Sequence, residues 1–154
     1  ARLVKTPIAL VTLIDADQQW HKAREGTEVA VGVVETSDGP VALPAVEIAA
    51  DGGFYDYAAR YTAGTTEFHV PARLDDAVAK AAAEAALTAH ETLGLRDWSR
   101  SDLIIDAEGT PWFLEVNVAP GMTETSRVPQ TLAAAGIDMG AQMAALVERA
   151  VARV

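Results

Sequence analysis

Residues 100–117, RSDLIIDAEGTPWFLEVN, constrain the fold more than any other segment of the chain. Two apolar runs flank a turn that we place at residues 107–110, a pattern that predicts an antiparallel β-hairpin. In this register Asp106 pairs with Pro111, and side chains alternate between the two faces of the hairpin. One face then carries five apolar side chains: Leu103, Ile105, Trp112, Leu114 and Val116. The chain is therefore expected to build its core on an antiparallel sheet.

The opposite face of this hairpin is polar. The same register places Asp102 opposite Glu115 and Arg100 opposite Asn117, so the four side chains point the same way. Two facing carboxylates repel each other and need a cation, which Arg100 supplies in part. Two carboxylates and an amide oxygen are hard ligands that suit Mg²⁺ or Mn²⁺. We predict a metal site; the alternative is a solvated face with an isolated Arg–Asp pair, and a register shift of one residue would scatter the cluster.

The remaining segments predict an α+β fold in which antiparallel β-hairpins pack against helices. TEVAVGVVE alternates in hydrophobicity, and it returns through SDGP into VALPAVEIA, where Pro44 indicates an edge strand or a bulge. Residues 51–72 have paired glycines and weak periodicity, and we expect a long structured loop there. Helices are expected at residues 74–93, 129–135 and 140–153. We expect His69 in the loop and His90 on a helix surface.

Composition narrows the function classes. The chain has 154 residues, of which 50% are hydrophobic, enough for the core of one domain. Its formal net charge of −10 argues against a nucleic-acid or anionic-membrane partner. The absence of cysteine excludes disulfides, zinc–thiolate sites and cysteine nucleophiles. No run approaches the roughly 18 apolar residues of a membrane span, so we expect a cytoplasmic protein.

Three motifs together resemble the D-alanine–D-alanine ligases, a family of ATP-grasp enzymes. RSDLIID…GTPWFLEVNVAPGMTETSRVPQTLAAAGID resembles the C-terminal part of that family, and GGFYDYAARYTAGTTEFHVPA resembles its mobile loop. EGTEVAVGVV is similar to the strand that carries a ribose-contacting acid. The resemblance implies that residues 1–154 form a single partial ATP-grasp domain, the C-terminal half of a ligase without the N-terminal domain and phosphate loop.

The resemblance also implies roles at the hairpin and the loop that follows it. By position, Asp102, Glu115 and Asn117 look like the ligands of two Mg²⁺ ions that bridge the phosphates of ATP. Catalytic stabilisation of a negatively charged tetrahedral species is implied for Arg100 and the backbone N–H of Gly121.

Further roles are implied for the acceptor and nucleotide sites. Ser126, with the backbone at Arg127, looks like the group that holds the carboxylate of the second D-alanine; read without the family, NVAPGMTETS is an ordinary turn with a helix cap. Arg60 resembles the basic residue that reaches the transferred phosphate, and Tyr61 the tyrosine that latches the mobile loop. Glu28 resembles the ribose-contacting acid. Lys22 matches the nucleotide-binding segment, whereas His21 and Arg24 depart from it.

The activity implied is ATP-dependent ligation of two D-alanines through an acylphosphate, a step of peptidoglycan precursor synthesis, with this chain supplying the metal and second-substrate half. By itself the chain is expected to be inactive. Two alternatives stay open: another ATP-grasp carboxylate–amine ligase, and a non-catalytic nucleotide-binding remnant. A homodimer is possible in the full-length protein.

Overall fold

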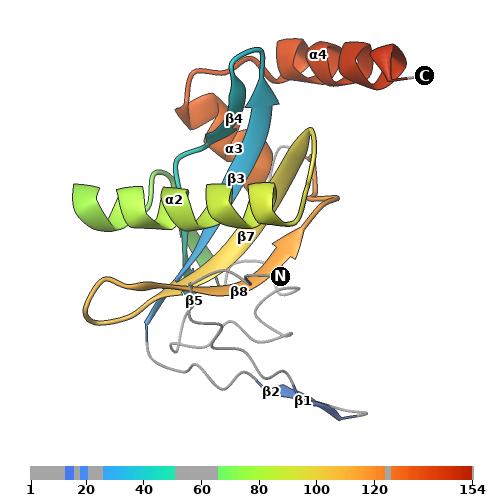
Figure 1. The fold of residues 1–154 in the computed structure, drawn as a ribbon. Coiled ribbons are helices and arrows are strands. Elements are labelled where there is room, and N and C mark those ends of the chain that lie inside the picture. Colours follow the sequence, from blue (N-terminus) through green and yellow to red (C-terminus); the bar gives the residue numbers. More distant parts are fainter. Residues whose placement is uncertain (1–12, 16–17, 21–25, 51–65, 124–125, 154) are drawn as a thin grey trace.

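The computed structural model describes residues 13–15, 18–20, 26–50, 66–123 and 126–153 (Figure 1). Within these residues the elements follow one another in this order: β1 Leu13–Asp15, β2 Gln18–Trp20, β3 Thr27–Thr36, β4 Gly39–Ala42, β5 Val46–Ala50, β6 Thr66–His69, α2 Asp76–Thr92, β7 Trp98–Ile105, β8 Pro111–Asn117, α3 Arg127–Ala134 and α4 Met139–Ala152. In these same parts of the chain, no helix is both long enough and apolar enough to cross a bilayer.

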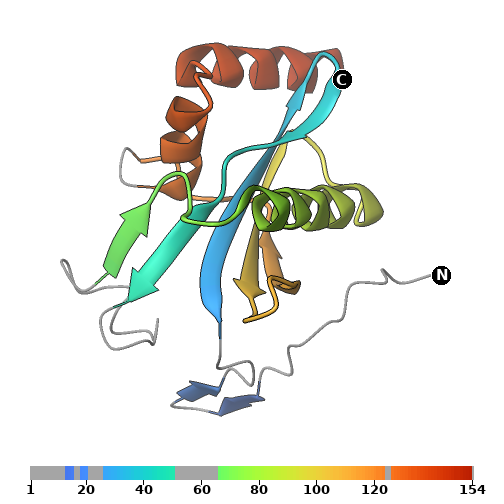
Figure 2. The same cartoon turned by 90° about the vertical axis from the view of Figure 1, so that its left-hand side faces the viewer.

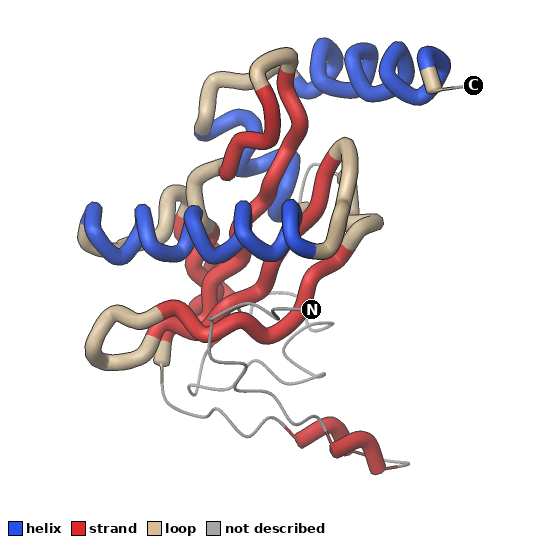
Figure 3. The backbone as a smooth tube through the Cα atoms, in the orientation of Figure 1, coloured by secondary structure: helices blue, strands red, loops and turns tan. Residues whose placement is uncertain are grey.

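One antiparallel sheet organises the described fold. Its strand order is β6-β5-β3-β7-β8, and β4 also pairs with β3; β1 and β2 form a separate two-stranded hairpin. The long strand β3 is central, because it pairs with β7 over eight positions, from Thr27 opposite Ile105 to Val34 opposite Trp98. The predicted α+β architecture of antiparallel hairpins and helices is confirmed (Figure 3).

The strand that returns from β3 is divided at Pro44. After the turn between Thr36 and Gly39, β4 pairs with the last residues of β3, and β5 pairs with its first residues along the same edge. Pro44 has no N–H to donate to a ladder, so the pairing stops between the two strands. The backbone stays close, since the N–H of Leu43 donates to the carbonyl of Gly32 over 2.8 Å.

Helices cover the two faces of the sheet unequally. In Figure 2, α2 lies on one side of β3 and α3 on the other. The cluster under α2 consists of buried apolar residues from three elements: Val29, Val31, Val33, Ala82, Ala86, Leu103 and Ile105. The small alanine side chains let α2 approach the valine-rich strand closely. A second cluster joins α3 to the sheet through Val34, Leu43, Val128 and Leu132. The expected alternation of β3 is therefore confirmed.

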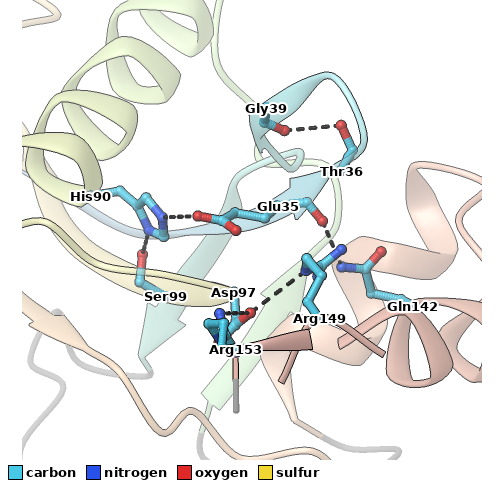
Figure 4. A network of polar contacts seen from close by, with 9 residues as sticks. All are labelled: Glu35, Thr36, Gly39, His90, Asp97, Ser99, Gln142, Arg149 and Arg153. Carbon is cyan, nitrogen blue, oxygen red and sulfur yellow. Dashed lines mark hydrogen bonds and ion pairs between the residues drawn. The ribbon is translucent and has the colours of Figure 1, made fainter. Parts of the chain in front are cut away.

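Three local expectations are wrong. Residues 66–69 form β6 rather than part of a loop, and His69 lies in that strand; residues 51–65 fall outside the described residues. His90 is not on the helix surface, because only 1% of it is exposed. Its Nδ1 lies 2.8 Å from Oγ of Ser99 on β7, so the last turn of α2 is attached to the sheet by a buried polar contact (Figure 4).

Charged side chains, rather than an apolar face, attach helix α4 to the rest of the fold. Val147 is 58% exposed, whereas Arg153 donates two hydrogen bonds, of 3.1 and 2.8 Å, to the carboxylate of Asp97 (Figure 4). Arg149 lies 3.6 Å from the same carboxylate. Asp97 has a left-handed backbone with φ of 69°, and its carbonyl accepts from the N–H of Glu35 at 2.8 Å. This one residue therefore joins α4 to the end of β3.

This attachment predicts a pH-dependent loss of stability in Asp97→Asn. The hydrogen bonds from Arg153 hold the pKa of Asp97 below its ordinary value of 3.8. A group whose pKa is lowered by folding stabilises the protein above its unfolded pKa, and this contribution is lost as the pH falls through the folded pKa. Asparagine tolerates the left-handed backbone, so the substitution removes mainly the charge.

We expect Asp97→Asn to lower the Tm by about 2 °C at pH 7. The difference from the parent should shrink as the pH falls below 3.8, the ordinary pKa of this carboxyl. Thermal unfolding followed by circular dichroism measures both quantities. Glu108→Gln, at an exposed turn position, is the matched control for the loss of one acidic charge. Equal melting temperatures of Asp97→Asn and the parent at pH 7 would contradict the assignment.

Candidate functional site

The turn between β7 and β8 differs from the predicted one by one residue. Ile105, not Asp106, pairs with Pro111, and the pairing continues with Ile104 opposite Trp112. The reason is the Asp106 carboxylate, which accepts the N–H of Thr110 over 2.7 Å and the indole N–H of Trp112 over 2.7 Å. These hydrogen bonds, that of Trp112 foremost, lower the pKa of Asp106. Asp106 therefore stabilises the turn and does not pair with Pro111 in the ladder.

This shift corrects the predicted core face near the turn. Phe113, not Leu114, lies opposite Leu103 and packs against the cluster under α2. Trp112 pairs with Ile104 on the other face of the sheet. Leu103 and Ile105 are buried in that cluster as predicted.

A β-bulge restores the predicted register before the polar cluster begins. The ladder is irregular between Asp102 and Leu103, where Leu114 is the extra residue of β8. Beyond the bulge, Asp102 lies opposite Glu115 and Arg100 opposite Asn117, as predicted. The errors at the turn and at the bulge cancel, so the four polar residues share one face of the sheet.

Arg100 and Asp102 form a buried ion pair on this face. Nε and Nη2 of Arg100 donate to the two carboxylate oxygens of Asp102 over 2.8 and 2.7 Å. Arg100 is 8% exposed and Asp102 is 5% exposed. Glu115, in contrast, is exposed on the edge strand β8. The pair thus provides the cation that two facing carboxylates require, with both oxygens of Asp102 in fixed orientation.

Strand β3 forms the neighbouring part of the same face. Ala30 lies opposite Asp102, and Gly32 lies opposite Arg100, so the residues beside the ion pair are small. One row further along, Glu28 lies between Ile48 of β5 and Ile104 of β7. Glu28 is half-buried. The register gives this residue an apolar neighbour on each side. Sequence reasoning identified Glu28 but missed Ile48 and Ile104, because only strand order brings them beside it.

The loop after β8 begins at this face. Oδ1 of Asn117 accepts the N–H of Ala119 over 2.9 Å, which fixes the orientation of the amide. Further on, Gly121 lies against the hydroxyl of Ser126: a Cβ added to this glycine would be 2.8 Å from Oγ of Ser126. A glycine at position 121 therefore lets the backbone approach this hydroxyl.

Ser126 occupies the cap position of α3 but does not cap the helix with its side chain. Its Oγ instead lies 2.8 Å from Oγ1 of Thr123 and accepts the N–H of Thr123 over 3.1 Å. The ordinary helix-cap interpretation is thus wrong for this hydroxyl, which faces back into the loop. Arg127 is the first residue of α3 and lies next to it.

The donor set of the polar face fits a hard divalent cation. Asp102, Glu115 and Asn117 offer two carboxylates and an amide oxygen on adjacent strands. Among the residues that the structure describes, no three His, Cys, Asp or Glu side chains converge, so an ion held here would need further ligands such as phosphate or water. The other predicted site residues, Lys22, Arg60 and Tyr61, lie outside the described residues.

The buried ion pair predicts an asymmetric response to mutation. Arg100→Leu leaves the buried carboxylate of Asp102 without its arginine partner, so we expect the free energy of unfolding to fall by about 3 kcal/mol. The double variant Arg100→Leu/Asp102→Leu should recover most of this loss, because no uncompensated charge remains. Urea unfolding measures both. A double variant less stable than Arg100→Leu would contradict this account of the pair.

Comparisons with known proteins match most of this chain to one family. Residues 8–148 match the family model described as D-ala D-ala ligase C-terminus. The D-alanine--D-alanine ligase of Anaeromyxobacter dehalogenans (strain 2CP-C) is 50% identical over 113 residues, which cover 73% of this chain and 35% of that protein. The chain therefore spans about a third of the length of this curated relative.

Solved structures show the same fold. The crystal structure of the VanG D-Ala:D-Ser ligase from Enterococcus faecalis superposes with a TM-score of 0.71 at 31% identity, covering 83% of this chain and 37% of that one. The D-alanine--D-alanine ligase from Bacillus anthracis complexed with ATP gives a TM-score of 0.66 at 26% identity, over 83% of this chain and 40% of that one. The α+β fold is that of the C-terminal lobe of ATP-grasp ligases, and the chain belongs to the D-alanine–D-alanine ligase family, whose C-terminal part it represents.

Proposed function

We propose that this chain forms the metal and second-substrate half of an ATP-dependent ligase that joins two D-alanines, a step of peptidoglycan precursor synthesis. The observation that carries the proposal is one sheet face with Arg100, Asp102, Glu115 and Asn117, from which the loop with Gly121 and Ser126 departs. A ligation that builds negative charge on phosphate and on a tetrahedral carbon needs positioned cations and N–H donors. The residues proposed for both needs belong to this sheet face and to the loop that leaves it.

Nucleotide binding follows from the same face. Asp102, Glu115 and Asn117 would hold Mg²⁺, two ions by the family pattern or Mn²⁺ in their place, and bound metal would neutralise the charge of the ATP phosphates. The relative from Bacillus anthracis has been crystallised with ATP. We place the ribose at Glu28, between two isoleucines, and assign Lys22 to the nucleotide-binding segment.

The reaction has two steps in this proposal. The carboxylate of the first D-alanine attacks the γ-phosphate, which forms an acylphosphate and releases ADP. The amine of the second D-alanine then attacks the acyl carbon and expels phosphate. Arg100 and the N–H of Gly121 stabilise the anionic tetrahedral species, while Ser126 and the backbone of Arg127 hold the acceptor carboxylate.

We assign Arg60 to the transferred phosphate and Tyr61 to closure of the segment that covers the site. We also propose the cytoplasm as the location of the complete protein, a homodimer as its assembly, and no nucleic-acid or membrane partner.

A second acceptor, D-serine, is favoured by one observation. Ser126 is followed by a cationic residue, Arg127, and the structure of a D-Ala:D-Ser ligase is 31% identical to this chain. A polar neighbour of the acceptor site suits an acceptor with a hydroxyl group better than an apolar neighbour does. Acceptor choice is thus part of the test, together with the alternatives of another carboxylate–amine ligase and a non-catalytic nucleotide-binding remnant.

A chimeric ligase tests the proposal. The matched residues of the Anaeromyxobacter dehalogenans protein are replaced by those of this chain, and phosphate release is followed with ATP, Mg²⁺ and D-alanine, D-serine or D-lactate. We expect release that depends on D-alanine, with the dipeptide identified by mass spectrometry. A chimera that folds and binds Mg-ATP but forms no product with any acceptor would support the remnant instead.

Glu115→Gln in this chimera tests the metal assignment. The substitution removes one anionic ligand from an exposed position, so the fold should be kept while phosphate release falls by about 100-fold or more. Glu108→Gln, at the exposed turn of the same hairpin, is the matched control and should keep parental activity. Full activity of Glu115→Gln at limiting Mg²⁺ would refute the assignment.

A further inference from the structure

The first residue of α3 is stacked on the edge strand of the sheet. The guanidinium carbon of Arg127 lies 5.2 Å from the centroid of the Phe68 ring, within the range of a cation–π interaction. Phe68 belongs to β6, where it lies opposite Ile48 on the face that also carries Glu28. Residues 127 and 68 are far apart in sequence, so this contact connects two separate parts of the site.

A cation at this helix position is locally unfavourable. The N-terminus of a helix carries a partial positive charge, so a cation there is destabilising. The first turn of α3 has no acidic residue that would offset this effect. The contact with the Phe68 ring is favourable and opposes it. We therefore assign the contact of Arg127 with Phe68 to fixing the position of the helix end.

The loop that ends at Arg127 is held at two places. At its start, Asn117 accepts the N–H of Ala119. Within it, the hydroxyl of Ser126 bonds to Thr123, and the N–H of Ser126 donates to the carbonyl of Thr123 over 2.8 Å. These bonds join Thr123 to Ser126, and the contact with Phe68 attaches the next residue, Arg127, to the sheet.

We propose that the Arg127–Phe68 pair is a positioning element that anchors the Gly121–Ser126 loop to the edge strand β6. This proposal rests on the assignment of Ser126 to the acceptor carboxylate. In this proposal the guanidinium acts through its contact with the ring, so its charge alone does not suffice. The pair holds the Ser126 hydroxyl at a fixed place over the sheet, and the affinity for the acceptor depends on an aromatic ring at position 68.

Hydrogen exchange in the chain itself tests the anchor without any need for activity. In Phe68→Leu and in Arg127→Lys, the amides of Thr123 and Ser126 should exchange about two- to five-fold faster. Phe68→Tyr keeps the ring face and should match the parent. The double variant Phe68→Leu/Arg127→Lys should be no worse than either single variant, since each removes the same contact. Lys80→Leu, a distant exposed cation on α2, is the control.

Kinetics of the chimeric ligase provides the second readout. Phe68→Leu and Arg127→Lys should raise the KM for the acceptor about two- to five-fold, while kcat and the KM for ATP stay within about two-fold of the parent. Parental exchange rates in both single variants would overturn the anchor. So would Arg127→Lys with parental behaviour beside an impaired Arg127→Leu, because charge alone would then account for the role. If the parent chimera makes no dipeptide, the proposed function fails, while the exchange measurement still decides the anchor.

Discussion

The sheet of this chain contains a buried carboxylate, and its stability depends on how that charge is compensated. Asp102 is buried on β7 and lies directly opposite a second acid, Glu115, on β8. The arrangement is stable because Arg100, two residues earlier on the same strand and therefore on the same face, binds both oxygens of Asp102. Small residues on β3 leave room for this pair. The strand thus contains both the charge that a metal site would use and the cation that makes this charge tolerable without a metal.

The two faces of the sheet differ in the helices that cover them. Helix α2 covers the opposite face through an apolar cluster, whereas α3 packs over Val34 and Leu43, at one end of the polar side. Beyond α3 the same side carries Glu28, which is half-buried, and Glu115, which is exposed.

The sequence predicted the strands of the two hairpins formed by TEVAVGVVE with VALPAVEIA and by residues 100–117, and it predicted the shared face of the four polar residues, because alternation with period two is a strong local signal. It failed where side chains contact distant backbone. The carboxylate of Asp106 takes part in the turn and shifts the register, and the bulge at Leu114 shifts it back. Neither effect is visible in a hydrophobicity pattern. His90 was misplaced for a similar reason: its burial depends on Ser99, a partner on another element.

The least predictable feature of the site is the position of its loop in space. PGMT and the following serine indicate a turn, but nothing in the segment shows that β6 pairs with β5 and brings Phe68 beneath Arg127. Loop residues carry function only when a rigid scaffold fixes them. Here the scaffold is β6, a strand at the end of the described sheet, where it pairs with β5. The contact between Arg127 and Phe68 links this strand directly to the first residue of α3, so it acts on the distance between the strand and the helix.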